Sequence, residues 1–304
     1  MELKFKAAYE QYLIYIESRQ KEQSKKTLKE RFENKILPYF KDYDIYKLKE
    51  LDYVNFQNFI ESFNYSNNYK KNLHYLFTSF LDYCIRFYDL DKNVARLVGP
   101  YKYKNEIKVT KFYTIKEFKK FIKYVDNNIY KQFFNLMFFT GTRPGEAMAL
   151  RFSDLSNRII FINKTIDEHG CRLVNSPKTK SSIRKIEIDK KLYKDLLKLK
   201  QYYIKKYDDK NYDYYIFGGM KPLSPTTINR YKIKACKLAN IFPIKLHEFR
   251  HSHATLLVQK KIMINEVSRR LGHSDVTITL NTYTHTDKMQ EKRVIKTLNF
   301  LRFF

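Results

Sequence analysis

The side chains best suited to chemistry in this chain are concentrated in one stretch, HEFRHSHAT, at residues 247–255. The stretch holds three of the seven histidines of the chain, together with one arginine. On a helix, His247 and Arg250 share a face because they are three residues apart, so both can reach one ligand. Arginine offers a fork of donors that matches two phosphate oxygens, and histidine gives or takes a proton near neutral pH. The pair therefore favours phosphoryl chemistry.

The same stretch allows two other interpretations. His247, Glu248 and His251 satisfy the H-E-x-x-H pattern of zinc proteases, in which two histidines one helical turn apart bind the metal and the glutamate acts as the base. Alternatively, histidine and arginine on one helix face form only a solvated, basic surface. The rest of the chain separates these possibilities.

The composition favours a polyanionic partner. The 304 residues include 59 Lys and Arg against 32 Asp and Glu, a formal net charge of +27. Such an excess repels itself unless a polyanion neutralises it; nucleic acid is the commonest such partner, and a membrane surface is the other candidate. The sequence has no apolar run long enough to span a membrane, and charges stand where a signal peptide would begin its apolar segment. We therefore expect a soluble, cytoplasmic protein with no membrane partner.

Helical periodicity dominates the first third of the chain. Apolar residues recur at helical spacing and predict helices at residues 3–16, 25–40, 52–63 and 68–88, with little strand signal between them. Residues 1–98 are therefore expected to form a small helical domain. Gly99 and Pro100 open a polar, basic stretch that predicts a linker over residues 99–110.

The remainder of the chain mixes helices with a short β-region. Thr114 and Glu117 have the spacing of a capping box, which predicts the start of a helix. Alternating or β-branched segments predict a small antiparallel sheet, with strands at residues 158–166, 171–174 and 183–188. Helices are expected at residues 130–139, 190–207, 226–239, 249–260, 265–271 and 288–300. The predicted fold class is mainly α with a small antiparallel β-sheet, in which residues 111–304 form an α+β domain that ends in a C-terminal tail helix.

Two basic stretches in this second domain add to the chemistry. TGTRPGEAMAL places Arg143 just after a helix end, in a turn rich in Gly and Pro, and Glu146 follows at a distance that allows it to pair with a basic neighbour and hold it in place. NSPKTKSS places Lys178 and Lys180 at the tip of the second turn of the sheet. Both stretches can bring cations to a phosphate.

Two further stretches lie near the end of the chain. In RRLGHS, Gly272 is expected to end a helix in the left-handed conformation, directly before His273. NTYTHT carries Tyr283, ten residues beyond His273.

In this order the motifs resemble those of the tyrosine recombinase (phage integrase) family, with T-G-x-R-x-x-E, a hairpin lysine, H-x-x-R, L-G-H and a downstream tyrosine. The resemblance covers nearly the whole chain and is closest to integrases of phages and conjugative transposons of low-GC bacteria. It implies a SAM-like core-binding domain at residues 1–98 and a catalytic domain at residues 111–304. Two features depart from the family pattern. No arm-type DNA-binding domain precedes Leu3, as expected either of a short family member or of a shortened chain. I-E-I replaces I-P-L after the hairpin, a change expected to be harmless.

The resemblance implies a site-specific recombinase that cuts and rejoins double-stranded DNA through a 3′-phosphotyrosyl link, integrating or excising a mobile element in the bacterial nucleoid. It assigns two phosphate-binding arginines, a tyrosine nucleophile, a histidine that accepts the phenolic proton, a lysine that donates a proton to the leaving 5′-oxygen, and a second histidine on a phosphate oxygen. Arg143 and Arg250 are the two arginines, and Tyr283 is the nucleophile. His247 is the proton acceptor, Lys178 is the proton donor, and His273 is the histidine on the phosphate oxygen. No cofactor and no metal are implied. The tail is expected to dock on a neighbouring copy in a tetrameric complex.

Alternatives stay open for several residues. Lys180 competes with Lys178 as the hairpin lysine, although Lys178 follows the turn proline as the family lysine does. His251 and His253 are expected to pack beneath the helix or bind backbone, and Glu146 to brace the arginine pocket. A DNA-binding protein without catalysis is the principal alternative function. A zinc protease built on HEFRH is the weaker one, because it leaves the arginine of TGTRPGE, the lysine and the tyrosine without a role.

Overall fold

The computed structural model describes residues 2–20, 22–102, 111–167, 173–174 and 182–272. The chain divides into two compact units, Met1–Ile107 and Lys108–Phe304, and each is described by itself. The division falls inside the stretch that the sequence predicts as a linker. The exact ends of the two domains stay a prediction.

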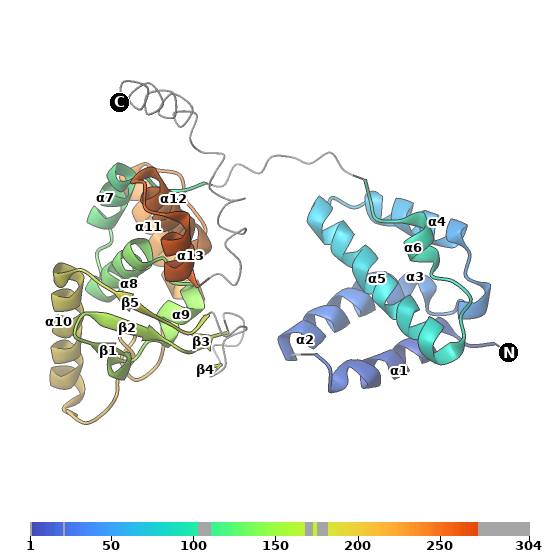
Figure 1. The fold of residues 1–304 in the computed structure, drawn as a ribbon, viewed down its shortest axis with the longest axis horizontal. Helices are drawn as coiled ribbons and strands as arrows, with labels where there is room; N and C mark the ends of the chain where they lie inside the picture. The colour runs from blue at the N-terminus through green and yellow to red at the C-terminus, as the bar shows by residue number, and fades with distance from the viewer. Residues whose placement is uncertain (1, 21, 103–110, 168–172, 175–181, 273–304) are drawn as a thin grey trace, which may run out of the picture. The chain divides into compact units, whose positions relative to one another are not determined.

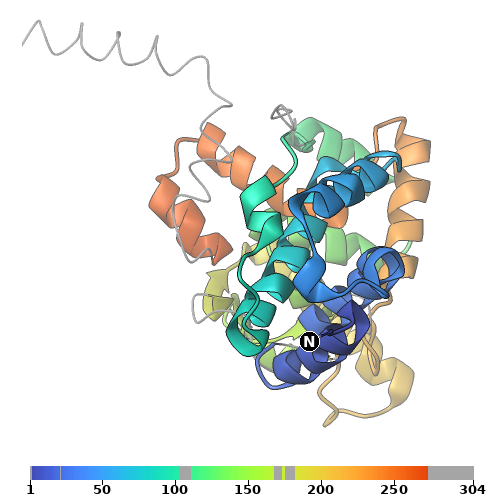
Figure 2. The ribbon, with the colours of Figure 1, turned by 90° about the vertical axis from the view of Figure 1, so that its right-hand side faces the viewer.

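The described part of the first unit is helical (Figures 1 and 2). The predicted helix at residues 25–40 begins three residues earlier and runs without a break through a π-helical segment, η1. The short helix α6 was not predicted, because five residues are too few to show a period; the Asn93 side chain caps it by accepting from the Arg96 N–H at 3.1 Å. The elements are α1 (Phe5–Glu17), α2 (Glu22–Arg31), η1 (Phe32–Ile36), α3 (Leu37–Phe40), η2 (Ile45–Lys47), α4 (Glu50–Glu61), α5 (Asn67–Tyr88) and α6 (Val94–Val98).

Aromatic side chains form the core of the first unit. Phe5 is fully buried, and its ring lies 4.7 Å from the Phe80 ring and 5.4 Å from the Phe40 ring, measured between centroids. Such ring pairs add to the free energy of burying the apolar surface itself. The many aromatic residues of this segment are therefore explained by the core, and the helical period that predicted the elements is the period of this core.

The second unit combines helices with short strands (Figure 1). The predicted capping box is present, since the Thr114 side chain accepts from the Glu117 N–H and the Glu117 carboxylate accepts from the Thr114 N–H at 2.8 Å. The helix predicted at residues 190–207 has these bounds in the structure. The elements are α7 (Ile115–Lys123), α8 (Asn128–Thr140), α9 (Pro144–Ala149), η3 (Phe152–Asp154), β1 (Leu155–Ser156), β2 (Ile159–Ile162), β3 (Thr165–Ile166), β4 (Leu173–Val174), β5 (Arg184–Glu187), α10 (Lys190–Tyr207), α11 (Pro225–Ala239), α12 (Leu246–Gln259) and α13 (Ile264–Leu271).

The strands are antiparallel, as predicted, but they belong to two sheets. One sheet has the order β1-β2-β5, with Ile160 opposite Ile186, and the other pairs β3 with β4. The single strand predicted at residues 158–166 is therefore wrong: it breaks after Ile162, and its second part turns to α9. Gly145 explains the close approach of α9 to β3, because a Cβ there would lie 2.5 Å from the Ile166 carbonyl oxygen. Among the described residues, the two flanks of the predicted hairpin belong to different sheets.

The core of the second unit connects α8 with α12. The Phe118 ring stacks on the Phe138 ring at 3.8 Å between centroids, and Phe249 of α12 is fully buried against Phe134 of α8. This packing fixes α12, which carries HEFRHSHAT, against α8, which ends at Thr140, three residues before Arg143. No helix in the described parts of the chain is long and apolar enough to cross a membrane. Mainly helical units with small antiparallel sheets confirm the predicted fold class.

Candidate active site

Helix α12 presents the first pair of candidate residues. It begins at Leu246, three residues before the predicted start, because the Glu248 carboxylate accepts from the Lys245 N–H at 2.6 Å and so caps the helix. His247 and Arg250 both lie on this helix, three residues apart, as the sequence predicts. His247 is exposed, whereas Arg250 is only 2% exposed. One residue is thus reachable from solvent while the other is held in the protein.

Arg250 is held by the carboxyl ends of two other helices. Its Nη1 donates to the Gly141 carbonyl oxygen at 2.8 Å, and its Nη2 donates to the Leu271 carbonyl oxygen at 2.7 Å. Gly141 follows α8 and Leu271 ends α13, so both carbonyls lie at the partially negative end of a helix, where a cation is stabilised. The guanidinium therefore has a fixed position before any ligand arrives.

A left-handed glycine makes this arrangement possible. Gly141 has φ +68°, and a Cβ there would lie 2.6 Å from the His253 ring and 2.7 Å from the Leu271 side chain. A larger residue would push α12 and α13 away from the end of α8. The glycine of T-G-x-R thus serves the packing that brings Arg250 to this point.

Arg143 approaches the same place from α9. It is the N-cap residue of α9, its Nη1 donates to the Glu146 Oε1 at 2.7 Å, and its Nη2 lies 3.4 Å from the Gly272 carbonyl oxygen. Arg250 binds the carbonyl of Leu271, so the two arginines hold consecutive carbonyls at the end of α13. The Arg143 side chain is 36% exposed. The structure therefore brings together the two arginines that the sequence separates by more than a hundred residues.

Glu146 is buried between two guanidinium groups. Besides Arg143, it accepts from Arg184, whose Nη1 and Nη2 donate to the two carboxylate oxygens at 3.1 and 2.8 Å. Burial works to raise the pKa of Glu146, but the hydrogen bond and charge of Arg184 and the charge of Arg143 outweigh it and lower this pKa to about 2. Glu146 is ionised at neutral pH. The bonds fit the predicted brace and not an acid or base.

Arg184 was not identified from the sequence. It is 8% exposed and stands on β5, in which buried and exposed positions alternate. The sequence does carry a signal for a special role of Arg184. This arginine occupies an inward position of a predicted strand, where an apolar residue is expected. Its partner Glu146 lies 38 residues earlier in the chain, so only the tertiary structure reveals the pair.

His247 has the protonation state that a proton acceptor requires. Partial desolvation lowers its pKa to about 4, and the neighbouring His251, Arg250 and Arg143 charges act in the same direction. The His247 and His251 rings lie 5.2 Å apart between centroids. Because the His247 side chain is nevertheless exposed, its imidazole is both neutral at pH 7 and accessible to a substrate.

His253 has a structural role, as predicted. It is buried, with Nδ1 at 2.9 Å from the Phe138 carbonyl oxygen, and Arg270 Nε donates to its Nε2 at 3.2 Å. Since Nε2 accepts, the proton lies on Nδ1, which donates to the carbonyl. Burial, followed by the charge of Arg270, lowers the pKa of His253 to about 3, so the ring stays neutral.

Half of the predicted catalytic set lies outside the described residues. This holds for Lys178 and its competitor Lys180, for His273, and for Tyr283. Gly272 is the last of the described residues. It has φ +71° and caps α13 in the left-handed conformation, as the sequence predicts. Leu271 and Gly272, the described part of the L-G-H motif, supply the carbonyls that Arg250 and Arg143 approach.

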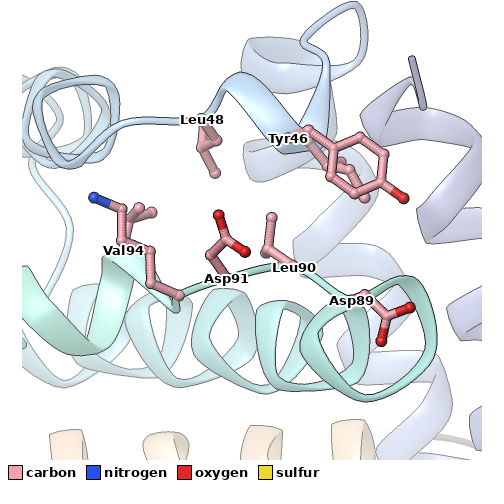
Figure 3. A pocket seen from close by; sticks show the side chains of 8 residues that line it. Tyr46, Leu48, Asp89, Leu90, Asp91 and Val94 are labelled. Atoms are coloured by element: carbon pink, nitrogen blue, oxygen red, sulfur yellow. The ribbon is translucent and has the colours of Figure 1, made fainter. Parts of the chain in front are cut away.

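Two other features of the described residues do not provide a phosphate or metal site. A hollow of about 100 Å³ in the first unit lies between η2 and the start of α6, with the Asp91 carboxylate turned into it and Asp89 at its rim (Figure 3). Two of its lining residues, Asp89 and Asp91, are acids against a single cation, Lys92, so the hollow does not suit a phosphate. In the described residues, no group of three or more His, Cys, Asp or Glu side chains is arranged to hold a metal ion. Glu248, the base of the zinc-protease pattern, caps the helix instead.

Comparison with known proteins is consistent with these observations. A model of the phage integrase family matches residues 111–290, and a model of the phage integrase N-terminal SAM-like domain matches residues 4–60. The ICEBs1 integrase of Bacillus subtilis is 31% identical over 280 residues, which covers 88% of this chain and 74% of the relative.

Solved structures share the fold. The Tn1549 transposon integrase, solved in complex with transposon right end DNA, has a TM-score of 0.78 at 18% identity over 98% of this chain and all of that one. The lambda integrase tetramer bound to a Holliday junction has a TM-score of 0.70 at 16% identity over 93% of this chain and 78% of that one.

Proposed function

This chain belongs to the phage integrase family of tyrosine site-specific recombinases, and we propose that it cuts and rejoins double-stranded DNA to integrate or excise a mobile element. The observation that carries the proposal is the convergence of Arg143 and Arg250 on consecutive carbonyls at the end of α13, beside an accessible neutral His247. Two fixed cations beside a neutral base suit the binding of a phosphodiester and the transfer of a proton during its cleavage.

In the proposed reaction the Tyr283 hydroxyl attacks the scissile phosphorus. The bond from phosphorus to the phenolic oxygen forms while the bond from phosphorus to the 5′-oxygen breaks. The phenolic proton passes to His247, and Lys178 donates a proton to the departing 5′-oxygen. The products are a 3′-phosphotyrosyl link and a free 5′-hydroxyl. Because the new link conserves the bond energy, the 5′-hydroxyl of a second strand can reverse the reaction without a nucleotide cofactor.

The cations stabilise the charge that develops on the phosphorane. Arg143 and Arg250 are proposed to bind the non-bridging oxygens, with His273 on one of them. Guanidinium groups fixed in advance by backbone carbonyls need no reorganisation when the charge appears, and such preorganisation is typically the largest contribution to rate. The two arginines and the lysine supply the positive charge, so we propose no metal and no cofactor.

The low pKa of His247 has a consequence for the order of events. An imidazole with a pKa of about 4 is a weak acceptor for a phenol, whose ordinary pKa is about 10. The cations that depress this pKa are the groups that the scissile phosphate would neutralise. We therefore propose that DNA binding itself raises the basicity of His247 and so activates Tyr283 only when a phosphate is in place.

The same proposal covers the organisation of the chain. Residues 1–98 are assigned as the core-binding domain, residues 99–110 as the linker and residues 111–304 as the catalytic domain. The net charge of +27 and the DNA in the solved structures of similar fold support a double-stranded DNA substrate. The lambda tetramer on a Holliday junction supports a homo-oligomeric, tetrameric synapse, which we propose is joined by the tail at residues 288–304. The reaction is assigned to the bacterial nucleoid.

A nicked suicide substrate tests the proposed function. The wild-type chain should form a covalent adduct with labelled DNA in the presence of EDTA, and the label should map to Tyr283. Tyr283→Phe removes the attacking oxygen and keeps the ring, so DNA affinity should be retained while the adduct disappears. An adduct in Tyr283→Phe would show that another tyrosine is the nucleophile. Tight binding with no adduct by the wild type would favour the alternative, a DNA-binding protein without catalysis.

A further inference from the structure

Arg184 is a buried cation that the proposed reaction does not use. It stands at an inward position of β5 and is 8% exposed. A guanidinium in such a place must be fully paired, because desolvating an unpaired charge is several kcal/mol unfavourable in proteins. Its hydrogen bonds therefore show what the fold uses it for.

One side of Arg184 leads to Arg143. Nη1 and Nη2 of Arg184 donate to Oε1 and Oε2 of Glu146, and Oε1 also accepts from Nη1 of Arg143 at 2.7 Å. The carboxylate is thus shared between two guanidinium groups, and Glu146 itself belongs to α9. A brace of this kind fixes Arg143 through its partner and not by direct contact.

The shared carboxylate also preserves the charge of the site. Arg143 and Glu146 alone would form a neutral pair, which attracts a phosphate weakly. With Arg184 added, two positive groups face one negative group, and the cluster keeps a net charge of +1. The second cation therefore allows Glu146 to orient Arg143 without cancelling it.

The other side of Arg184 leads to Arg250. Arg184 Nε donates to the Arg270 carbonyl oxygen at 2.8 Å, Arg250 binds the next carbonyl, that of Leu271, and Arg143 approaches the one after it, that of Gly272. Three consecutive carbonyls at the end of α13 thus take three arginines. Arg184, which comes from the sheet, fixes the helix end on which both phosphate-binding arginines depend.

We propose that Arg184 is a positioning residue for strand cleavage, one that orients Arg143 through Glu146 and supports Arg250 through the end of α13. This inference rests on the proposed function. Arg184 does not touch the DNA in this assignment, so its loss acts on the rate of cleavage and much less on affinity.

Arg184→Lys tests the assignment, because lysine keeps the charge but replaces the planar fork of donors with a single ammonium, which cannot reproduce the bidentate pair with Glu146. Single-turnover cleavage of the suicide substrate should slow about 10²-fold, the typical effect of a displacement of about 1 Å in a reacting group. The DNA dissociation constant should change less than about threefold. Arg158→Lys is the matched control: it is the same substitution near the same sheet, in an exposed pair with Glu187 at 3.3 Å, and it should cleave like the wild type.

A double-mutant comparison separates positioning from a general loss of stability. If Arg184 acts through Arg143, then Arg184→Lys should slow a chain that already carries Arg143→Lys far less than it slows the wild type. Losses that multiply in the double variant would overturn the inference, as would wild-type cleavage by Arg184→Lys. A wild-type chain that forms no adduct would overturn the proposed function and this inference together. Cleavage by the wild type alongside normal cleavage by Arg184→Lys would overturn this inference alone.

Discussion

Replacement of Glu146 by glutamine should strongly destabilise the second unit. The carboxylate is 4% exposed and accepts from both Arg143 and Arg184, so the substitution leaves two guanidinium groups without their anion. Breaking a buried pair by removing one partner typically costs about 3–5 kcal/mol. The size of the pKa shift supports the same figure: a fall from 4.5 to about 2 corresponds to about 3 kcal/mol at neutral pH.

The pH dependence of this effect has a definite sign. Because the folded-state pKa of Glu146 is depressed, its contribution is fully present above the unfolded-state value of 4.5 and is lost as the pH falls toward about 2. The advantage of the wild type over Glu146→Gln should therefore shrink by roughly half at about pH 3.

Urea unfolding followed by hydrogen exchange of peptides from α8 and α12 would measure this effect. These helices report on the second unit separately from the first. Glu187→Gln is the control, because Glu187 pairs with Arg158 on the surface and its loss should change the free energy of unfolding by less than about 1 kcal/mol. A loss below about 1 kcal/mol in Glu146→Gln, or a difference that grows toward low pH, would refute the account of Glu146 as an ionised brace.

Four further outcomes are expected. Arg250→Ala should lower the single-turnover cleavage rate by about 10² to 10³-fold, since one preorganised contact to the developing charge is typically worth that much. NMR titration should show the pKa of His247 rising from about 4 when cognate DNA binds to Tyr283→Phe; an unchanged value would contradict activation by the phosphate. DNA affinity should fall about 10³-fold or more between 50 and 200 mM salt if about 6–10 phosphates are contacted, and a flat dependence would contradict binding dominated by phosphates. Deletion of residues 289–304 should spare binding to a single site but abolish strand exchange, and normal recombination by the shortened chain would exclude the tail as the link between protomers.

Local signals in the sequence determined the elements and the order of the chemistry. The capping box at Thr114, the left-handed cap at Gly272 and the bounds of α10 were all readable, because each depends on residues within one or two helical turns. The H-x-x-R pair was placed on one helix for the same reason. The family resemblance depends on the order of five short motifs along the chain, and each motif is itself a local pattern.

The tertiary structure decided how these elements meet. Arg250 binds a carbonyl 109 residues away, and Arg184 meets Glu146 only because β5 pairs with β2 while α9 turns back to β3. The break of the predicted strand after Ile162 and the short α9 follow from that packing and not from any local period. The role of a buried arginine in a strand cannot be assigned until its anionic partner is known. The energy of such a pair comes from two positions that the fold brings together. The sequence thus predicts the candidate residues, and long-range packing decides how the described ones, Arg143, His247 and Arg250, are held.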